Sequence, residues 1–321
     1  MKNWKHFVFV AILAFSCVIY GNAQNNSQPM INTYIAGSYM DGNTEKACYW
    51  KNGERITLEN GRKAVAITVA NGKVYTAGDY LTDKVYAFDI FYSKPCYWID
   101  GIRIAFPNYI YGTIKSMTVI NGSVYSIGVD TYPTRSDYYL LVNTNTQSSS
   151  KECLEYITTV DGVTYISGYS GSPYYSAYGQ RVGLDGSNAY GITVVNGSVY
   201  VAGNDYRSNN SIPCYWVDGV KRVLPGIGVA TRIAVINGVE HVIGHNNRSG
   251  NDYEAYYWVN GEKTQLTNAA SFSEIKNYNG NIYITGSFKQ GAINIACVWK
   301  NGERFVIPGG KTALDIVVVQ E

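Results

Sequence analysis

A short apolar segment that ends in glycine occurs seven times in this 321-residue sequence. The copies start 35 to 50 residues apart and are TYIAG (33–37), VYTAG (74–78), VYSIG (124–128), TYISG (164–168), VYVAG (199–203), EHVIG (240–244) and IYITG (282–286). Periods of this length are typical of propeller blades and of solenoid repeats. The pattern of residues around each copy distinguishes between these two architectures.

Two hairpin patterns accompany the repeated segment. Every copy after the first follows an apolar run and an Asn-Gly or Asp-Gly pair, as in ITVANGKVY (67–75), and most copies precede a second hairpin, as in CYWKNGERITL (48–58). Asn-Gly favours the two-residue type I′ turn, because that turn needs a positive φ at both central residues. Each unit thus has four short strands and no helical periodicity. The sequence predicts an all-β protein, a seven-bladed β-propeller of four-stranded antiparallel blades.

The two ends of the chain complement each other. The last segment, LDIVVVQE (314–321), matches the first strand of a unit, whereas the N-terminal copy at 33–37 lacks such a strand before it. We expect the C-terminal strand to pair with the N-terminal blade and close the ring over residues 31–321. The similar segments 47–58 and 296–307 would then lie in adjacent blades. Segments 138–147 and 177–186 are poorer matches to the second hairpin.

The first 30 residues have a different pattern. Lys2 and Lys5 precede an apolar run at 7–20, too short for a comfortable membrane span, and GNA precedes Gln24. We predict a signal peptide at 1–23, a linker at 24–30 and an exported protein, extracellular or periplasmic, with a lipid anchor at Cys17 as the minor alternative. Without the leader, 24 basic residues balance 24 acidic ones. That balance argues against a nucleic-acid or anionic membrane partner.

Recurring Trp and Cys residues are better explained by packing than by chemistry. In a strand, residues two apart share a face, and neighbouring blades cover both faces of a blade. A functional site would not be repeated in five blades. We therefore predict inter-blade packing for Trp50, Trp98, Trp216, Trp258 and Trp299, and buried, reduced thiols for Cys48, Cys96, Cys214 and Cys297. Cys153 makes the number of cysteines after the leader odd.

Metal and catalytic motifs are missing from the sequence. His241 and His245 are four residues apart, but on a strand their rings would lie about 13 Å apart, too far to share a metal ion. No CxxC, GxSxG, phosphate loop or HExxH is present. We expect no metal or cofactor, and a non-catalytic protein is favoured over an enzyme.

The residues that do not repeat are the best candidates for function. Tyr-rich loops at 78–95, 128–139, 168–178, 203–213 and 244–255 would share the propeller face opposite the tight turns. Tyrosine beside hydrogen-bonding groups suits a glycan or a protein ligand. The candidate binding residues in these loops are Tyr80, Tyr92, Tyr132, Arg135, Tyr174, Tyr206, Arg207 and Tyr253. The first strands add unlike residues at the channel mouth, namely Tyr156, Arg232, Glu274 and Asp315.

With its strand, turn and Trp hairpin, the chain over residues 31–321 resembles secreted bacterial propeller-repeat proteins, including those with HAF-type extracellular repeats. The resemblance implies a surface or periplasmic binding role and names no ligand. The leading hypothesis is a monomeric, non-catalytic binding protein that presents its Tyr-rich loop face. One alternative is a carbohydrate-active lyase or hydrolase that uses loop carboxylates, and another is a structural scaffold of the cell envelope.

Overall fold

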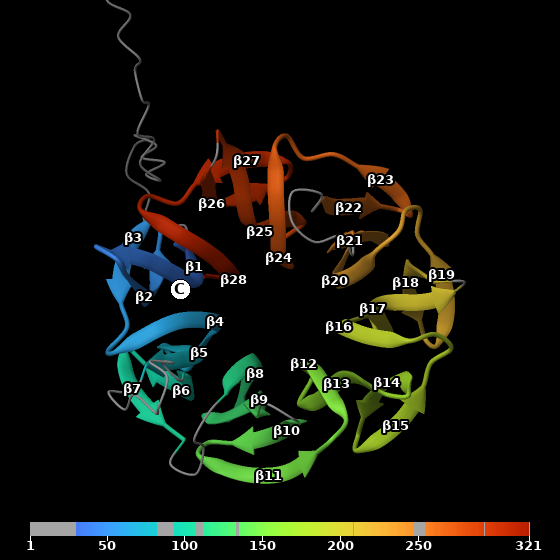
Figure 1. Cartoon of the computed structure of the whole chain (residues 1–321), viewed down its shortest axis with the longest axis horizontal. Coiled ribbons are helices and arrows are strands. Elements are labelled where there is room, and N and C mark those ends of the chain that lie inside the picture. Colours follow the sequence, from blue (N-terminus) through green and yellow to red (C-terminus); the bar gives the residue numbers. More distant parts are fainter. Residues whose placement is uncertain are drawn as a thin grey trace, which may run out of the picture.

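The computed structural model describes residues 30–81, 93–106, 112–132, 135–207, 209–246, 254–291 and 293–320. The predicted signal peptide, Cys17 and residues 24–29 of the predicted linker lie outside these ranges. Seven four-stranded antiparallel sheets form a ring around a central channel, as Figure 1 shows. The seven-bladed all-β propeller is thus confirmed. Within the described ranges, no helix is long and apolar enough to span a membrane.

The four strands of each blade run from the channel outwards. Blades 1 to 7 are β28-β1-β2-β3, β4 to β7, β8 to β11, β12 to β15, β16 to β19, β20 to β23, and β24 to β27. The inner strands are β28 (Gly310–Gln320), β4 (Gly61–Ala70), β8 (Thr113–Ile120), β12 (Cys153–Val160), β16 (Asn188–Val195), β20 (Val229–Ile236) and β24 (Ala269–Tyr278). The second strands are β1 (Ile31–Asp41), β5 (Lys73–Leu81), β9 (Ser123–Tyr132), β13 (Val163–Ser170), β17 (Ser198–Arg207), β21 (Val239–His245) and β25 (Asn281–Gln290).

The outer half of each blade is a second hairpin. Its third strands are β2 (Thr44–Lys51), β6 (Ser93–Ile99), β10 (Arg135–Val142), β14 (Ser172–Ala177), β18 (Asn210–Val217), β22 (Ala255–Val259) and β26 (Ile293–Lys300). Its fourth strands are β3 (Glu54–Thr57), β7 (Ile102–Ala105), β11 (Asn145–Ser150), β15 (Gln180–Gly183), β19 (Val220–Val223), β23 (Glu262–Thr264) and β27 (Glu303–Val306).

Blade 1 joins the two ends of the chain. Strand β28 pairs with β1 in antiparallel register, from Ile31 opposite Gln320 to Tyr39 opposite Gly310. The prediction that the C-terminal strand closes the ring is confirmed (Figure 1). The two similar segments now lie in neighbouring blades, since Cys48 and Trp50 of blade 1 share a core cluster with residues 296, 298 and 307 of blade 7.

The hydrophobic core is divided among the seven blade interfaces. Each of seven apolar clusters combines residues of two neighbouring blades. All five repeat tryptophans are buried in these clusters. The indole N–H of Trp98 donates to the Glu59 carbonyl at 2.9 Å, and that of Trp216 donates to the Asp185 carbonyl at 3.0 Å. Both acceptors lie where one blade passes into the next, so the predicted inter-blade role of tryptophan is confirmed.

The repeated glycine accommodates a bulge in each inner strand. In blade 2 the pairing shifts between Ala64 and Ala66, and the other inner strands shift at the corresponding place. In every blade except blade 3, the bulge brings the preceding backbone against the second strand. A Cβ atom on Gly78 would lie 1.9 Å from the carbonyl oxygen of Lys63. Only glycine leaves room for this approach.

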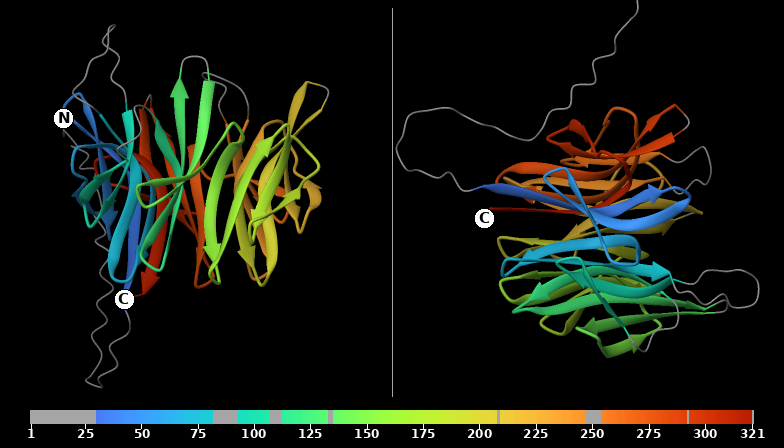
Figure 2. Two further views of the ribbon diagram at one scale, coloured as in Figure 1. Left: turned by 90° about the horizontal axis from the view of Figure 1, so that it is seen from below. Right: turned by 90° about the vertical axis from the view of Figure 1, so that its left-hand side faces the viewer.

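The tight turns and the long hairpins lie on opposite faces of the ring. At Asn71-Gly72 both φ angles are positive, 51° and 71°, as the type I′ prediction requires. We call this side the turn face and the other side the hairpin face, and Figure 2 shows the strands running between them. Several predicted loops on the hairpin face are wrong, because β13 and β14 are separated by Gly171 alone and β17 extends to Arg207. Exposed strand ends need no apolar alternation, so their Tyr, Ser and Asn residues resemble a loop in sequence.

Cysteine and histidine take structural positions. All five described cysteines are free, and those at 48, 96, 214 and 297 are buried, as predicted. His241 Nδ1 lies 2.7 Å from the Tyr257 hydroxyl, and His245 Nδ1 lies 2.7 Å from the Asn246 carbonyl. Among the described residues, no three His, Cys, Asp or Glu side chains gather in a way that could hold a metal ion.

Candidate functional site

One position of the inner strands carries a different residue type in every blade. It is the residue directly after the bulge, and the seven copies, here called the channel ring, are Ala66, Ser116, Tyr156, Gly191, Arg232, Glu274 and Asp315. Small residues occupy three of these positions, and charged residues occupy three consecutive blades. The charged residues of the channel ring therefore lie on one side of it, whereas the scaffold around the ring is uniform.

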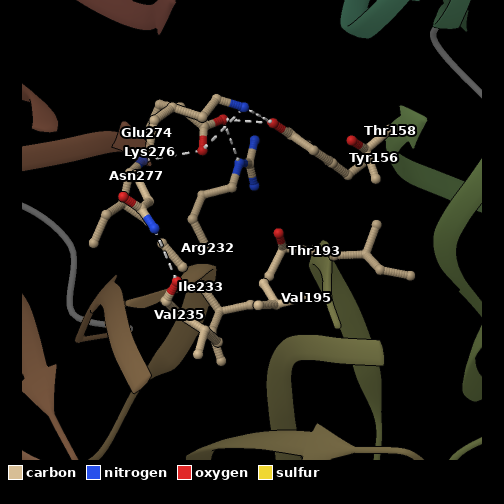
Figure 3. A pocket seen from close by; sticks show the side chains of 13 residues that line it. Tyr156, Thr158, Thr193, Val195, Arg232, Ile233, Val235, Glu274, Lys276 and Asn277 are labelled. Atoms are coloured by element: carbon tan, nitrogen blue, oxygen red, sulfur yellow. Dashed lines mark hydrogen bonds and ion pairs between the residues drawn. The ribbon is translucent and has the colours of Figure 1, made fainter. Parts of the chain in front are cut away.

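Four side chains on the charged side of the ring form one network, here called the channel cluster (Figure 3). The Tyr156 hydroxyl donates to Glu274 Oε2 at 3.0 Å, and Arg232 Nε donates to the same oxygen at 3.1 Å. Lys276 Nζ donates to the Tyr156 hydroxyl at 2.6 Å and lies 3.9 Å from Glu274 Oε1. The guanidinium of Arg232 also stacks on the Tyr156 ring, 4.6 Å from its centroid. The carboxylate of Glu274, only 4% exposed, thus has a donor on every side.

The cluster brings together strands that are distant in sequence. Tyr156 is on β12, Arg232 on β20, and Glu274 and Lys276 on β24. Between them, β16 carries Gly191 at the ring position, where a Cβ atom would lie 3.1 Å from Arg232 Cδ and 2.5 Å from the Thr231 carbonyl oxygen. The missing side chain of Gly191 leaves the space in which Arg232 reaches towards Tyr156.

Burial and mutual attraction set the pKa values of the cluster. Burial raises the pKa of Tyr156, and the nearby Glu274 carboxylate raises it further. Burial alone would lower the pKa of Lys276, but Glu274 and Tyr156 outweigh that effect and the pKa is raised. The pKa of Arg232 is raised in the same way. Both cations are therefore held in the charged form beside a neutral phenol.

Asp315 stands next to the cluster in blade 1. Its Oδ2 accepts the backbone N–H of Ile67 at 2.9 Å, and its Oδ1 accepts that of Ile316 at 2.8 Å. Burial raises its pKa to about 6; Lys276 and the two backbone N–H groups act in the opposite direction, and Glu274 adds to the rise. Asp315 thus links the ring to blade 2 and carries a carboxyl group that titrates in the mildly acidic range.

A pocket of about 290 Å³ adjoins the channel cluster. Its lining residues lie on four inner strands and are Tyr156 and Thr158, Ile192, Thr193 and Val195, Arg232 to Val235, and Glu274 to Asn277. In every case these residues lead from the ring position to the Asn-Gly or Asp-Gly turn. The channel pocket therefore extends from the cluster towards the turn face. Figure 3 shows the Thr193 hydroxyl and the Arg232 guanidinium at this pocket.

The sequence predicted part of this site. Tyr156, Arg232 and Glu274 do come together with Asp315 close by, but they lie inside the channel and not at its mouth on the hairpin face. Lys276, Thr158, Thr193 and Asn277 were missed. Lys276 had a signal, because it lies two residues after Glu274 on the same face of a strand.

The predicted loop residues that the structure describes are spread over four blades, 2 to 5. Tyr206 is 60% exposed, and Arg207 Nη2 pairs with Asp205 at 2.6 Å. Tyr80 carries the Arg103 guanidinium 4.2 Å from its ring centroid. Tyr132 and Arg135 are partners in the backbone register of β9 and β10, and Tyr92 and Tyr253 lie outside the described residues.

Tyr174 was placed wrongly by the sequence. It lies within β14 opposite Gly168, where Cys214 stands opposite Gly203 in blade 5. The side chain is 4% exposed, and its hydroxyl donates to Glu152 at 3.1 Å. Tyrosine replaces the repeat cysteine here, so this residue belongs to the core and not to a binding loop.

Comparisons with known proteins identify the fold. No family model and no curated protein matches the sequence. A puromycin-hydrolysing peptidase of Mycobacterium tuberculosis is similar in structure, with a TM-score of 0.51 and 7% identity over 88% of this chain and 54% of that one. This chain spans about half the length of that peptidase.

Two further structures have lower scores. A computationally designed protein, Ika8, has a TM-score of 0.46 and 12% identity over 87% of this chain and 89% of its own. A Bacteroides thetaiotaomicron protein of unknown function has a TM-score of 0.39 and 12% identity over 86% and 78%. At such identities the likeness is one of fold alone. The chain is an all-β propeller, and its function has to be argued from the channel.

Proposed function

We propose that this protein is an exported, non-catalytic binding protein that takes a sugar unit of a glycan into the channel pocket. The observation that carries the proposal is the pocket itself, which lies where the inner strands carry unlike residues at one position of the repeat. Export rests on the leader pattern at 1–23, and a relationship to HAF-type repeat proteins is part of the same proposal.

The lining of the channel pocket suits a sugar. Hydroxyl groups of Thr158 and Thr193 and the amide of Asn277 lie beside aliphatic side chains such as Ile192 and Val235. A sugar offers both hydroxyl groups and C–H faces, so it matches this mixture. The volume of about 290 Å³ is at the lower end of the usual range for small-molecule sites, which favours one sugar unit.

The carboxylates favour binding over catalysis. A glycoside hydrolase of the common type needs two carboxyl groups facing the substrate. Among the described residues that line the pocket, Glu274 is the only carboxylate, and its oxygens already accept from Tyr156, Arg232 and the backbone of Ile275. Asp315 does not line the pocket. A lyase or hydrolase is thus the less favoured alternative, and a purely structural scaffold would not need the pocket.

A protein ligand on the hairpin face is a second candidate. Exposed apolar side chains lie near the hairpin tips, among them Met40, Tyr206 and Ile293. Exposed apolar side chains of this kind can be buried against a protein partner. A pull-down of exported proteins with the mature chain would test this candidate separately.

Glycan-array binding by residues 24–321 tests the main proposal. Thr193→Val removes one pocket hydroxyl at nearly constant volume, and we expect about a tenfold loss of affinity for any bound glycan. Thr68→Val is the matched control, because Thr68 has the same register in blade 2 but does not line the pocket. The absence of any bound glycan, or equal binding by wild type and Thr193→Val, would refute the proposal. Turnover of a bound polysaccharide would establish the enzymatic alternative.

A further inference from the structure

A second hollow lies outside the channel, between blades 4 and 5 at the turn face. This inter-blade groove has a volume of about 660 Å³, and its walls include Tyr165, Tyr175, Tyr178, Val182, Val199 and Asp218. We propose that the inter-blade groove binds an arginine side chain of a peptide partner. The proposal is independent of the glycan in the channel pocket.

Tyr178 lies at the groove in a backbone conformation that is unusual for tyrosine. It occupies the first position of the turn between β14 and β15 with φ 52°, and every other described non-glycine residue at positive φ is Asn or Asp. Bulky side chains are rare in this conformation, and such strain concentrates at functional positions. The side chain of Tyr178 is also 76% exposed. A strained and exposed aromatic ring at the lip of a cavity therefore points to a ligand.

The next blade interface shows what fills the equivalent space. In blade 5, Arg222 on β19 pairs across the strands with Tyr215, and its guanidinium lies 5.9 Å from the centre of that ring. Arg222 Nη1 also lies 3.1 Å from Glu240 Oε1 of blade 6. An arginine of the protein itself thus occupies the space between blades 5 and 6.

The same two positions are apolar between blades 4 and 5. Val182 on β15 pairs with Tyr175 where Arg222 pairs with Tyr215, and Val199 on β17 stands four residues before the repeat glycine, as Glu240 does on β21. The guanidinium and its carboxylate are absent from this interface, and the groove is hollow at that place. Blade 5 therefore shows that a guanidinium fits this space, whereas blades 1 and 2 place Ile56 and Ile104 there.

Charge and shape agree with that assignment. No Lys or Arg is among the described residues that line the groove, whereas Asp161 and Asp218 are. After burial, the Asp218 charge is the next cause that raises the pKa of Tyr175, so this carboxylate acts directly on the groove. A planar guanidinium can stack on a tyrosine ring and pair with a carboxylate at the same time.

Arginine stacks on tyrosine elsewhere in the described part of this protein as well. Arg55 lies 3.9 Å from the Tyr39 ring centroid, and Arg181 lies 3.6 Å from that of Tyr174. The extended arginine stem would cover the groove tyrosines as these internal residues cover theirs. We therefore favour an arginine side chain over the amine of an amino sugar.

Two peptides test the proposal by NMR titration of the mature chain, residues 24–321. Acetyl-Gly-Arg-Gly amide should bind with shifts at the groove, and acetyl-Gly-Gln-Gly amide, its neutral match, should bind at least about tenfold more weakly. Equal binding of the two peptides, or no binding of the arginine peptide, would overturn the proposal. Chitosan oligomers form a third arm, and their binding in the groove without binding of the arginine peptide would also overturn it.

Three variants test the groove by filling its space or removing its charge. Val182→Arg copies Arg222 of the next blade and should weaken the arginine peptide about tenfold by filling the space. Asp218→Asn should weaken it to a similar extent while keeping the turn, because Asn52 accepts a backbone N–H at the same turn position at 2.9 Å. Asp100→Asn makes the same change in blade 2, away from the groove, and should leave binding unchanged. Undiminished binding by folded Val182→Arg would refute the assignment.

Discussion

Replacing Asp315 by asparagine tests the electrostatics of the channel. The carboxyl group is 8% exposed, and burial raises its pKa from 3.8 in a model peptide to about 6. The folded protein therefore holds a proton on Asp315 more tightly than the unfolded chain does. Folding stability from this group is highest below about pH 4, decreases as the pH rises towards 6, and is constant above that.

The size of the effect follows from the two pKa values. One pKa unit corresponds to about 1.4 kcal/mol. The difference between 3.8 and about 6 therefore makes the ionised side chain destabilising by about 3 kcal/mol at neutral pH. Asparagine resembles the protonated carboxyl group in shape and charge, but its amide nitrogen cannot accept one of the two backbone N–H groups that the Asp315 oxygens accept. We expect the stability of Asp315→Asn relative to wild type to rise by about 3 kcal/mol between pH 4 and pH 7.5. The lost hydrogen bond lowers the stability of the variant by the same amount at every pH.

Urea denaturation at pH 4, 5, 6 and 7.5 measures this difference, because all other titrating groups cancel between wild type and variant. The control Asp100→Asn removes a carboxylate from a turn on the surface, where asparagine already serves in blade 1. The expected result is a difference in unfolding free energy that grows between pH 4 and pH 6 for Asp315→Asn alone. A difference that is independent of pH, or one that falls with rising pH, would refute the reasoning.

Three further predictions concern the scaffold and the channel cluster. Glu274→Gln leaves two cations without their counter-charge and should lower the unfolding free energy by about 2–3 kcal/mol in chemical denaturation, and an unchanged value would contradict the network. Gly244→Ala places a Cβ atom 1.9 Å from a carbonyl oxygen, so we expect a loss of about 3 kcal/mol or more in unfolding free energy. Gly128→Ala, whose Cβ atom would have no neighbour closer than 3.4 Å, should lose about 1 kcal/mol in the same assay. Trp216→Phe should destabilise the protein by about 1–2 kcal/mol more than Trp50→Phe in thermal denaturation, because the Trp216 indole donates a hydrogen bond and the buried Nε1 atom of Trp50 has no hydrogen-bond partner.

The fold was predictable because the pattern of one blade occurs in seven copies. Each Asn-Gly turn and each Trp hairpin independently supports the same blade, so an error in one copy does not change the conclusion. The bulges were not predictable in this way, since a bulge is visible only when the residues of two paired strands are counted against each other. The repeat glycine was the one sign of the bulge in the sequence, because the close backbone approach needs glycine in every blade except blade 3.

The site was predictable only as a set of unlike residues. Sequence comparison of the first strands marked Tyr156, Arg232 and Glu274, but it could not show that Tyr156 reaches a carboxylate 118 positions away. That contact depends on the diameter of the closed ring and on the space at Gly191. Tyr174 shows the opposite error, because tyrosine in the place of a buried cysteine has the same composition as tyrosine in a binding loop.

Ring closure also has a consequence for the order in which the protein can be made. Strand β1 ends at Asp41, and its partner β28 begins at Gly310, so about 270 residues must be synthesised between the two halves of blade 1. At roughly 5–20 residues per second, β1 waits about 15–50 s with one edge unpaired. An unpaired strand edge can pair with another chain. The first blade to begin is thus the last to be completed, and the growing chain has to be kept from its neighbours until its final eleven-residue strand has left the ribosome.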